Sequence, residues 1–413
     1  MRTRGPIGGR RGLLLAGGVL AGASGAGAQL MQEPPGRDEA AARHAETFYS
    51  PHQPGIVTPP PAAGLVAAFD VLAPSRAELE RLFRVLTSRI AFLMAGGTPP
   101  ETDPRFPPPD SGILGPKIVP DGLTITVGVG ASLFDERFGL AARRPAELET
   151  MRRFPNDALD RAWVHGDLLV QICANVPMAA LHALRDLIKH TPDLLRLRWK
   201  LDGFLPPHAA GAKPETPRNL LGFKDGTANI DPKDERLLDQ LIWVQPGGAE
   251  PAWTAGGTYM AVRIIRNLVE RWDRTPLQEQ EAIMGRAKAS GAPLGRAKEH
   301  DDPDYASDPD GKRIPHDAHI RLANPHTPEA MRTRILRRPY NYSRGVTRAG
   351  QLDMGLIFIC FQRSLREGFI AIQERLNGEP LEEYIKPVGG GYFFVLPGVT
   401  GPDRFLGQEL LAA

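Results

Sequence analysis

A strand and helix order that occurs twice is the feature that most limits the folds open to this chain. Apolar runs predict strands at 64–72, 123–129, 167–175, 257–265 and 354–362. Helical periodicity predicts helices at 78–91, 177–190, 276–285 and 365–376. In the second of these helices, Leu181, Leu184 and Ile188 are expected to face the core. The repeat predicts a duplicated α+β unit, with two antiparallel sheets and helices on the outside.

Proline, glycine and charge mark the segments between these units. Residues 29–62 are rich in Pro, Ala and Gln and predict an exposed arm, and 205–216 has the composition of a linker. These boundaries give a first half at 63–205 and a second half at 216–413. The acidic segment 300–315 is expected to be a surface loop with solvated aspartates, because the aspartate spacing fits no regular calcium loop.

The first 28 residues have the pattern of a secretory signal peptide. A basic start precedes a short, glycine-diluted apolar run and a small-x-small site at Ala26–Ala28, so cleavage would leave Gln29 first. The apolar run is about half the ~20 residues that span a bilayer, which argues against stable membrane insertion. The pair Arg10–Arg11 favours the twin-arginine route to the periplasm, and ordinary n-region charge is the alternative.

Charge and cysteine content exclude several classes of protein. The net charge is +2 and no basic stripe carries interleaved aromatics, so a nucleic-acid partner is not expected. Cys173 and Cys360 both lie in apolar strands, which favours two free buried thiols over a disulfide. Neither CxxC nor HExxH occurs, so the sequence offers no zinc motif.

Three segments place an acid, an imidazole and a guanidinium among apolar or small residues. Asp225 lies in Gly222-Phe-Lys-Asp-Gly226, where glycines permit close approach of a planar ligand, although Asp-Gly is also a common surface turn. His319 could ligate haem iron or be a hydrogen-bonded core histidine. Pairing it with His316 in a metal site lacks a third ligand. Arg337, taken alone, has the pattern of a surface arginine.

Together, the order and spacing of these segments resemble the dye-decolorising haem peroxidases, and within that family the exported deferrochelatase branch. The resemblance covers nearly all of the chain after the leader. The matching segments are Tyr49–Ile56, Asn219–Asn229, Pro251–Tyr259, His319–Pro325, Gly350–Gly355 and Tyr384–Phe394. The family fold is a pair of ferredoxin-like halves with the haem in the C-terminal half, which agrees with the repeat.

The resemblance implies a role for each matching residue, with one haem b per chain. His319 falls on the proximal ligand of the haem iron, Asp225 on the distal acid and Arg337 on the distal arginine, which also contacts haem. The remaining haem-lining positions are Gly226, Thr227, Ala228, Asn324, Pro325 and His326. His326 is a departure, because arginine is more usual there; a histidine can still meet a haem propionate, but its charge depends on pH.

The chemistry expected of this set is peroxide reduction. Asp225 would shuttle a proton between the peroxide oxygens, and Arg337 would keep it ionised and stabilise developing negative charge. Bulky organic reductants are the expected donors, and Trp243, Trp253, Tyr259 and Tyr340 are candidate relays, although packing is the plainer role for each. Release of iron from haem for uptake components follows from the family branch, as does an expected homodimer. A non-catalytic haem carrier is the alternative, but it needs only His319 and an apolar slot.

Overall fold

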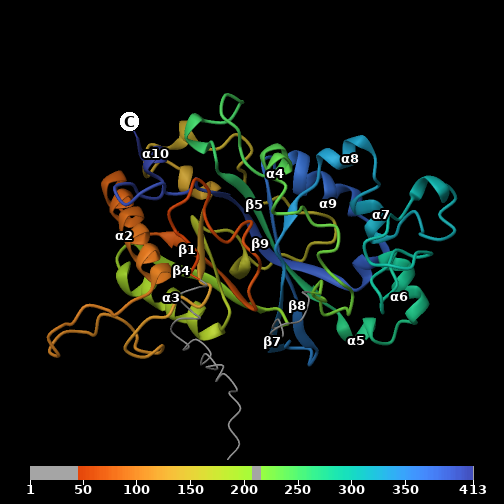
Figure 1. The fold of residues 1–413 in the computed structure, drawn as a ribbon, viewed down its shortest axis with the longest axis horizontal. Coiled ribbons are helices and arrows are strands. Elements are labelled where there is room, and N and C mark those ends of the chain that lie inside the picture. The colour runs from red at the N-terminus through yellow and green to blue at the C-terminus, as the bar shows by residue number, and fades with distance from the viewer. Residues whose placement is uncertain (1–44, 207–214, 413) are drawn as a thin grey trace, which may run out of the picture. The chain divides into compact units, whose positions relative to one another are not determined.

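The computed structural model describes residues 45–206 and 215–412. The expected leader, residues 29–44 of the expected arm and residues 207–214 of the expected linker lie outside this part. Within it, strands form a central layer, with α2 and α3 on one side and α7 and α9 on the other (Figure 1). No helix in the described ranges is both long and apolar enough to span a bilayer.

The first half has the strand order of a ferredoxin-like unit. Its elements are β1 (Ala63–Val71), α2 (Arg76–Ala95), β2 (Thr124–Gly130), β3 (Leu168–Ala174), α3 (Pro177–His190) and β4 (Leu195–Phe204). The strands lie in the order β2-β3-β1-β4, and each neighbouring pair is antiparallel. Helix α2 begins where the Ser75 side chain accepts a hydrogen bond from the Glu78 N–H, as expected of an N-cap.

The second half repeats this arrangement with longer insertions. Its strands are β5 (Thr258–Asn267), β6 (Leu336–Arg337), β7 (Tyr340–Val346), β8 (Leu352–Gln362) and β9 (Ile385–Val395). They lie in the order β9-β5-β8-β7, while β6 pairs with the far end of β8. The helices are α4 (Glu235–Leu241), α5 (Val269–Trp272), α6 (Leu277–Met284), α7 (His319–Ala323), α8 (Pro328–Arg332), α9 (Ala371–Leu376) and α10 (Gln408–Leu411). The helix expected at 365–376 starts with one π-helical turn, Arg366–Ile370.

The two expected sheets are joined at their edges. Three residue pairs connect β2 to β9, and Phe204 of β4 pairs with Asn341 of β7, so the described strands form one continuous nine-stranded sheet. The two antiparallel sheets of the expected repeat are therefore present, and their edges are joined. Unpaired edge strands expose backbone hydrogen-bonding groups, and pairing the edges of the two halves removes them.

Apolar residues from both halves fill the space between the two sheet segments. This inner cluster takes Val66 and Leu169 from the first half and Val262, Ile359 and Phe393 from the second. A second cluster lies under the outer helices, where α2 buries Leu79, Leu82, Phe83, Leu86 and Ile90. The helices thus cover the outer faces, as the repeat predicted.

Helix α3 packs by a different face from the one expected. Leu184 is buried, but the side chains of Leu181 and Ile188 are 36% and 37% exposed. The buried face is built instead on Ala180, Ala183 and Leu187. Small alanines allow a helix to approach its sheet closely, so the larger side chains lie at the edge of the contact.

The expectation of an exposed arm is wrong for Phe48, Gln53 and residues 55–56 of the segment 48–57, which are buried. The Gln53 amide lies in the core, where it donates to the carbonyls of Val127 and Leu396, both at 2.8 Å, and accepts from the Val127 N–H. The His52 ring stacks on Trp243 with centroids 3.8 Å apart. This segment bridges the two halves, because Val127 lies in β2 and Leu396 directly follows β9.

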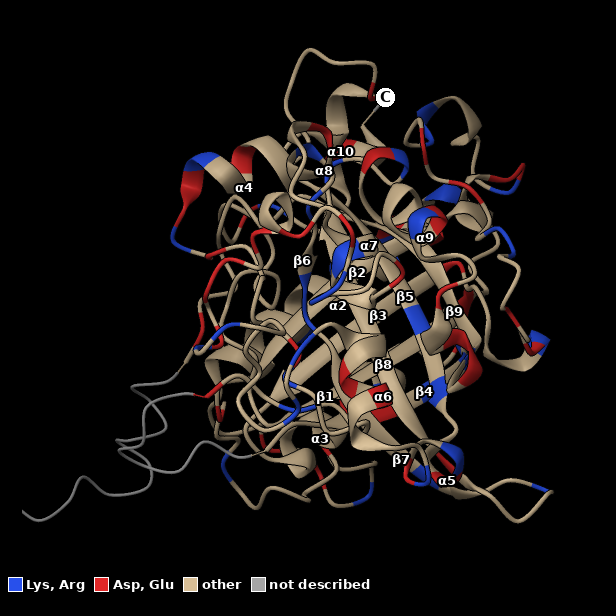
Figure 2. Ribbon diagram, turned by 90° about the vertical axis from the view of Figure 1, so that its right-hand side faces the viewer, with Lys and Arg blue, Asp and Glu red and all other residues tan. Residues whose placement is uncertain are grey.

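Lys and Arg positions are interspersed with Asp and Glu positions along the ribbon in Figure 2. The segment 300–315 contributes part of the acidic surface, but not all of its aspartates are solvated. Asp308 is only 5% exposed, and its carboxylate accepts the backbone N–H groups of Lys312, Arg313 and Ile314. These bonds hold the pKa of Asp308 below its usual value. Its role is to close a turn.

Candidate active site

A cavity of about 500 Å³ lies in the second half, on the outer face of β5 and β8. The sheet forms its floor, while α7 and α9 form the opposite wall. Its apolar lining includes Ile265, Leu356, Phe358, Phe369, Ile372 and Leu376. The first half contributes Asn156 and Asp157 at one end. Volume and lining are typical of a site for a sizeable, mostly apolar ligand.

His319, the first residue of α7, lies in the wall opposite the sheet. Its Nδ1 is 2.7 Å from Oε2 of Glu379, whose side chain is only 4% exposed. A carboxylate at Nδ1 accepts that N–H, which leaves the Nε2 lone pair free to ligate a metal. Burial alone lowers the pKa of His319, but the charge and hydrogen bond of Glu379 outweigh it and raise the pKa above its usual value.

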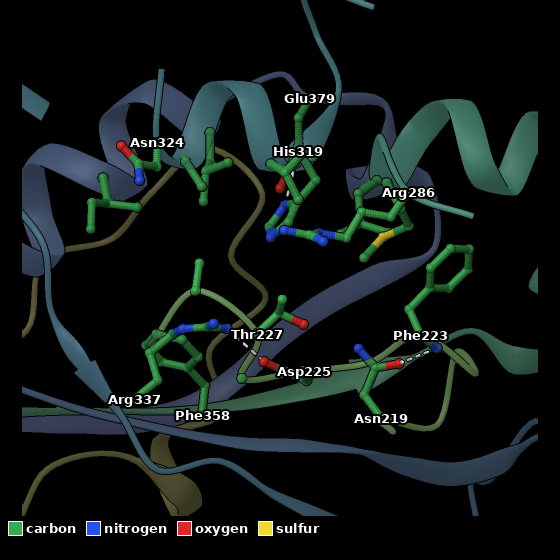
Figure 3. Close-up of a pocket in the computed structure, with 18 of the residues that line it drawn as sticks. Asn219, Phe223, Asp225, Thr227, Arg286, His319, Asn324, Arg337, Phe358 and Glu379 are labelled. Atoms are coloured by element: carbon green, nitrogen blue, oxygen red, sulfur yellow. Dashed lines mark hydrogen bonds and ion pairs between the residues drawn. The ribbon is translucent and has the colours of Figure 1, made fainter. Parts of the chain in front are cut away.

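Asp225 and Arg337 lie together on the other side of the cavity from His319 (Figure 3). Nη1 of Arg337 donates to Oδ1 of Asp225 at 2.5 Å. Their side chains are 14% and 26% exposed, so this ion pair is only partly hydrated. The structure thus brings together, around one cavity, the three residues on which the sequence prediction depends.

Asn229 holds the backbone of Arg337 in place. Its side-chain N–H donates to the Arg337 carbonyl, and its side-chain oxygen accepts the Arg337 N–H, both at 2.8 Å. The short strand β6 therefore receives its ladder bonds from β8 on one edge and from an asparagine side chain on the other. This links the loop that carries Asp225 to the strand that carries Arg337.

The remaining predicted haem-lining residues are at the cavity, with one exception. Gly226, Thr227, Ala228, Asn324 and His326 line it, whereas Pro325 does not. His326 has a positive φ of 57° and packs edge-on against Tyr305, with ring centroids 5.2 Å apart. Its Nδ1 is 3.6 Å from Oδ1 of Asp302.

Sequence reasoning missed several residues that the structure places at the site. Glu379, Asn229 and Glu299 each order a predicted site residue. Asn229 lies in a matching family segment, but nothing in the sequence connects it to Arg337, and Glu379 and Glu299 lie in no chemistry-bearing segment. The segment 299–303 and Tyr305 line the cavity, although the acidic segment was expected to be only a surface loop. Its acidic composition suggested solvent, and only the fold shows that it forms a wall.

The four candidate relay aromatics are all buried in the core, and none of them lines the cavity. Trp253 donates its indole N–H to the Arg143 carbonyl, and the Tyr259 hydroxyl is 2.5 Å from Oε1 of Glu250. Burial, together with Glu250, strongly raises the pKa of Tyr259. These hydrogen bonds hold the aromatic side chains within the core. A role in relaying electrons to the haem stays a prediction.

The residues present fit haem. The cavity offers apolar walls for the macrocycle, an imidazole nitrogen on one side, and an acid with an arginine on the other. Arg286 and Arg334 also line it, and neither forms a salt bridge with a carboxylate among the described residues. Burial lowers the pKa of both guanidinium groups. Unpaired, partly buried cations suit the two acidic groups of a haem.

The fold and cavity together define a haem-dependent enzyme built from two ferredoxin-like halves. The family models for Dyp-type peroxidases match nearly all of the described chain, the N-terminal model over residues 53–205 and the C-terminal model over residues 216–400. The chain belongs to the Dyp-type peroxidase family, and its cofactor is haem.

Curated relatives cover almost the whole chain. A deferrochelatase of Escherichia coli O157:H7 is 59% identical over 408 residues, which are 97% of this chain and 96% of that protein. A deferrochelatase of Shigella flexneri is 59% identical over 406 residues, with the same coverage.

Solved structures agree in fold. A DyP-type peroxidase from Cellulomonas bogoriensis superposes with a TM-score of 0.80 at 36% identity, covering 90% of this chain and 99% of that one. Ferric DtpA from Streptomyces lividans has a TM-score of 0.80 at 35% identity, covering 90% and 98%.

Proposed function

We propose that this chain is a haem peroxidase that reduces hydrogen peroxide with electrons from bulky organic donors, and that it also releases iron from haem with the porphyrin left intact. The observation that carries the peroxidase assignment is the Asp225–Arg337 pair on the opposite side of the cavity from His319. A haem carrier would need His319 and the apolar walls but not this partly buried ion pair. The geometry therefore favours catalysis over the carrier alternative.

Bound haem supplies the iron at which peroxide is activated. His319 would hold the iron through Nε2, since Glu379 keeps the proton on Nδ1 and strengthens the imidazole as a donor. Asp225 accepts the proton from one peroxide oxygen and returns it to the other. Arg337 holds the Asp225 carboxylate through its hydrogen bond and stabilises negative charge on the departing oxygen. Asn324, His326 and the segment Gly226–Ala228 line the cavity and would help to hold the cofactor.

The iron-release activity is supported by the relatives. Proteins named deferrochelatase are 59% identical to this chain over 97% of its length. In this activity haem is a substrate, and the freed iron would pass to components of an iron-uptake system. Export to the periplasm, through the twin-arginine route suggested by Arg10–Arg11, would place the protein where such iron is collected.

We also propose a homodimer.

One experiment separates the two activities. Purified haem-loaded protein is incubated with hydrogen peroxide and a bulky dye, and dye loss, free iron and metal-free porphyrin are measured in the same sample. Dye loss without free porphyrin would identify a peroxidase alone. Porphyrin released intact, in step with free iron, supports the second activity. The absence of both would favour the carrier.

A further inference from the structure

Glu299 lines the cavity and contacts the loop that carries Asp225, but it has no part in the peroxide chemistry proposed above. We propose that Glu299 is a positioning residue for peroxide reduction: it binds one residue on each side of Asp225, Lys224 and Thr227, and so fixes the Asp225 carboxylate against Arg337. This inference rests on the proposed role of Asp225 and assigns a function to a contact more than 70 positions away in the chain.

The Glu299 carboxylate makes three side-chain contacts to that loop. Oε2 accepts from Nζ of Lys224 at 2.5 Å, and Oε1 accepts from the hydroxyl groups of Thr216 at 2.5 Å and Thr227 at 2.9 Å. The side chains of Lys224 and Glu299 are each only 12% exposed. Lys224 directly precedes Asp225, and Thr227 follows it by two positions. One carboxylate therefore holds the loop on both sides of the acid.

The loop needs such a clamp because its own backbone constrains it weakly. Gly226, between Asp225 and Thr227, has a φ of 133°, a region open to glycine and strained for other residues. The Asp225 N–H donates to the Pro217 carbonyl at 2.8 Å, and Arg218 and Lys224 form an isolated β-bridge. These bonds fix the start of the loop. After Asp225 a backbone bond runs from the Asn229 N–H to the Gly226 carbonyl at 3.0 Å, and the Thr227 side chain adds the contact with Glu299.

Glu299 is itself held rigidly. Its backbone carbonyl accepts from Nη1 of Arg286 at 2.9 Å, and the same nitrogen donates to the Gly291 carbonyl at 2.6 Å. The residues that follow, 300–303, form part of the cavity wall. The clamp therefore connects two parts of the site: the cavity wall at residues 300–303 and the loop that carries Asp225.

The charge state of Glu299 excludes it as a proton donor. Burial by itself raises the pKa of Glu299, but hydrogen bonds from Lys224, Thr216 and Thr227 lower it to about 2. The carboxylate is thus ionised at neutral pH, and both of its oxygens already accept hydrogen bonds from the loop. It acts through the loop and not on peroxide directly.

The test is a double-mutant cycle on the haem-loaded protein, measured by stopped-flow as the second-order rate constant for reaction with hydrogen peroxide. Glu299→Gln keeps the shape of the side chain but removes the charge that binds Lys224. We expect the rate constant to fall about 10- to 100-fold, as for a small misplacement of a catalytic group, with haem affinity unchanged within about threefold. In an Asp225→Asn background, Glu299→Gln should have almost no further effect, because the residue it positions is already disabled.

Asp310→Asn is the matched control, because Asp310 is an exposed carboxylate of the same acidic segment, paired with Lys312. It should leave the rate constant unchanged. Lys224→Gln breaks the Lys224–Glu299 contact from the other side and should lower the rate constant about as much as Glu299→Gln does. The double variant Lys224→Gln with Glu299→Gln should lose no more than either single variant. If Glu299→Gln fails to fold, Lys224→Gln with Asp225→Asn completes the same cycle.

The outcomes separate the inference from the function it rests on. An unchanged rate constant in Glu299→Gln, or an equal further loss in the Asp225→Asn background, overturns the positioning role. An Asp225→Asn variant that reacts with peroxide at the wild-type rate instead overturns the proposed role of Asp225. If Glu299→Gln and Asp225→Asn each lower the rate constant, and the double variant loses no more than Asp225→Asn alone, the result supports both the positioning role of Glu299 and the proposed role of Asp225.

Discussion

Glu379 lies 60 positions beyond His319 in the chain, yet its Oε2 is 2.7 Å from the Nδ1 of that histidine. The carboxylate is buried, at 4% exposure, while the histidine faces the cavity. The pair therefore sets both the tautomer and the ring orientation of the residue proposed to bind iron. The sequence alone does not show which group binds Nδ1 of His319, and the structure identifies it as Glu379.

Glu379→Gln should weaken haem binding about 10- to 100-fold, because the amide keeps a hydrogen-bond acceptor but loses the charge that makes the imidazole a strong donor. Haem titration followed at the Soret band measures this loss. His319→Ala marks the larger loss expected when the axial bond is absent. Glu383→Gln, an exposed neighbour, is the control. Wild-type affinity in Glu379→Gln would assign the pair a structural role only.

Asp225→Asn should retain haem and lose peroxide turnover by about 10²- to 10⁴-fold, because an amide cannot accept the peroxide proton. Arg337→Leu removes the cation together with the polarity of that side of the cavity, and is expected to lose at least as much. Steady-state dye oxidation and the Soret spectrum of each variant test both expectations. Normal turnover in both variants would move the acid–base role to other residues.

Asp157→Asn should destabilise the fold by about 3–5 kcal/mol, because within residues 45–206 and 215–412 it removes the only carboxylate that pairs with a buried arginine. Arg263 is 1% exposed and pairs with Asp157 through both oxygens, next to the Phe154 ring. Urea unfolding of the haem-free protein measures the change. Asp103→Asn, in an exposed pair with Arg105, serves as the control and should change stability little. If Asp157→Asn and Asp103→Asn had equal free energies of unfolding, the buried Asp157–Arg263 pair would not be needed for stability.

The pKa of Glu299 predicts an acid dependence of stability. Because its folded pKa is lowered from 4.5 to about 2, the ionised carboxylate stabilises the native state fully above about pH 4.5. That contribution is lost as the pH falls through the range from 4.5 to 2. The stability of Glu299→Gln should therefore fall less over this range than that of the wild type, as measured by urea unfolding at each pH. Parallel curves for the two proteins would show that Glu299 titrates normally.

Arg10→Lys together with Arg11→Lys tests the export route, although the leader lies outside the described residues. The twin-arginine route requires the arginine pair, whereas the general route needs only positive charge. The double variant should accumulate in the cytoplasm as a folded precursor that contains haem. Cell fractionation with a Soret measurement of each fraction distinguishes the two. Normal periplasmic yield would assign the pair to ordinary n-region charge and place haem insertion after export.

Local patterns in the sequence were enough to predict the α+β class, the duplication and most of its elements. The strands at β1, β3, β5 and β8 and the helices α2 and α3 follow from apolar periodicity, because an element that buries one face must repeat its apolar residues at the period of that element. Asp225 and His319 were also recognisable, because they lie in segments that match a known family, and Arg337 was recognisable from its spacing after His319. The strands β4, β7 and β9 were not among the predicted segments.

The tertiary structure decided what depends on contacts between distant segments. The edges of the two sheets pair only because both halves present complementary strands, and neither half contains that information alone. Helix α3 could bury either of two apolar stripes, and the sheet beneath it selected the alanine face. Glu379, Asn229 and Glu299 became site residues through hydrogen bonds formed on folding, because a bond between side chains 60 or more positions apart leaves no local periodicity to detect. The sequence by itself determined which groups could do the chemistry; the fold decided which of them are held in place.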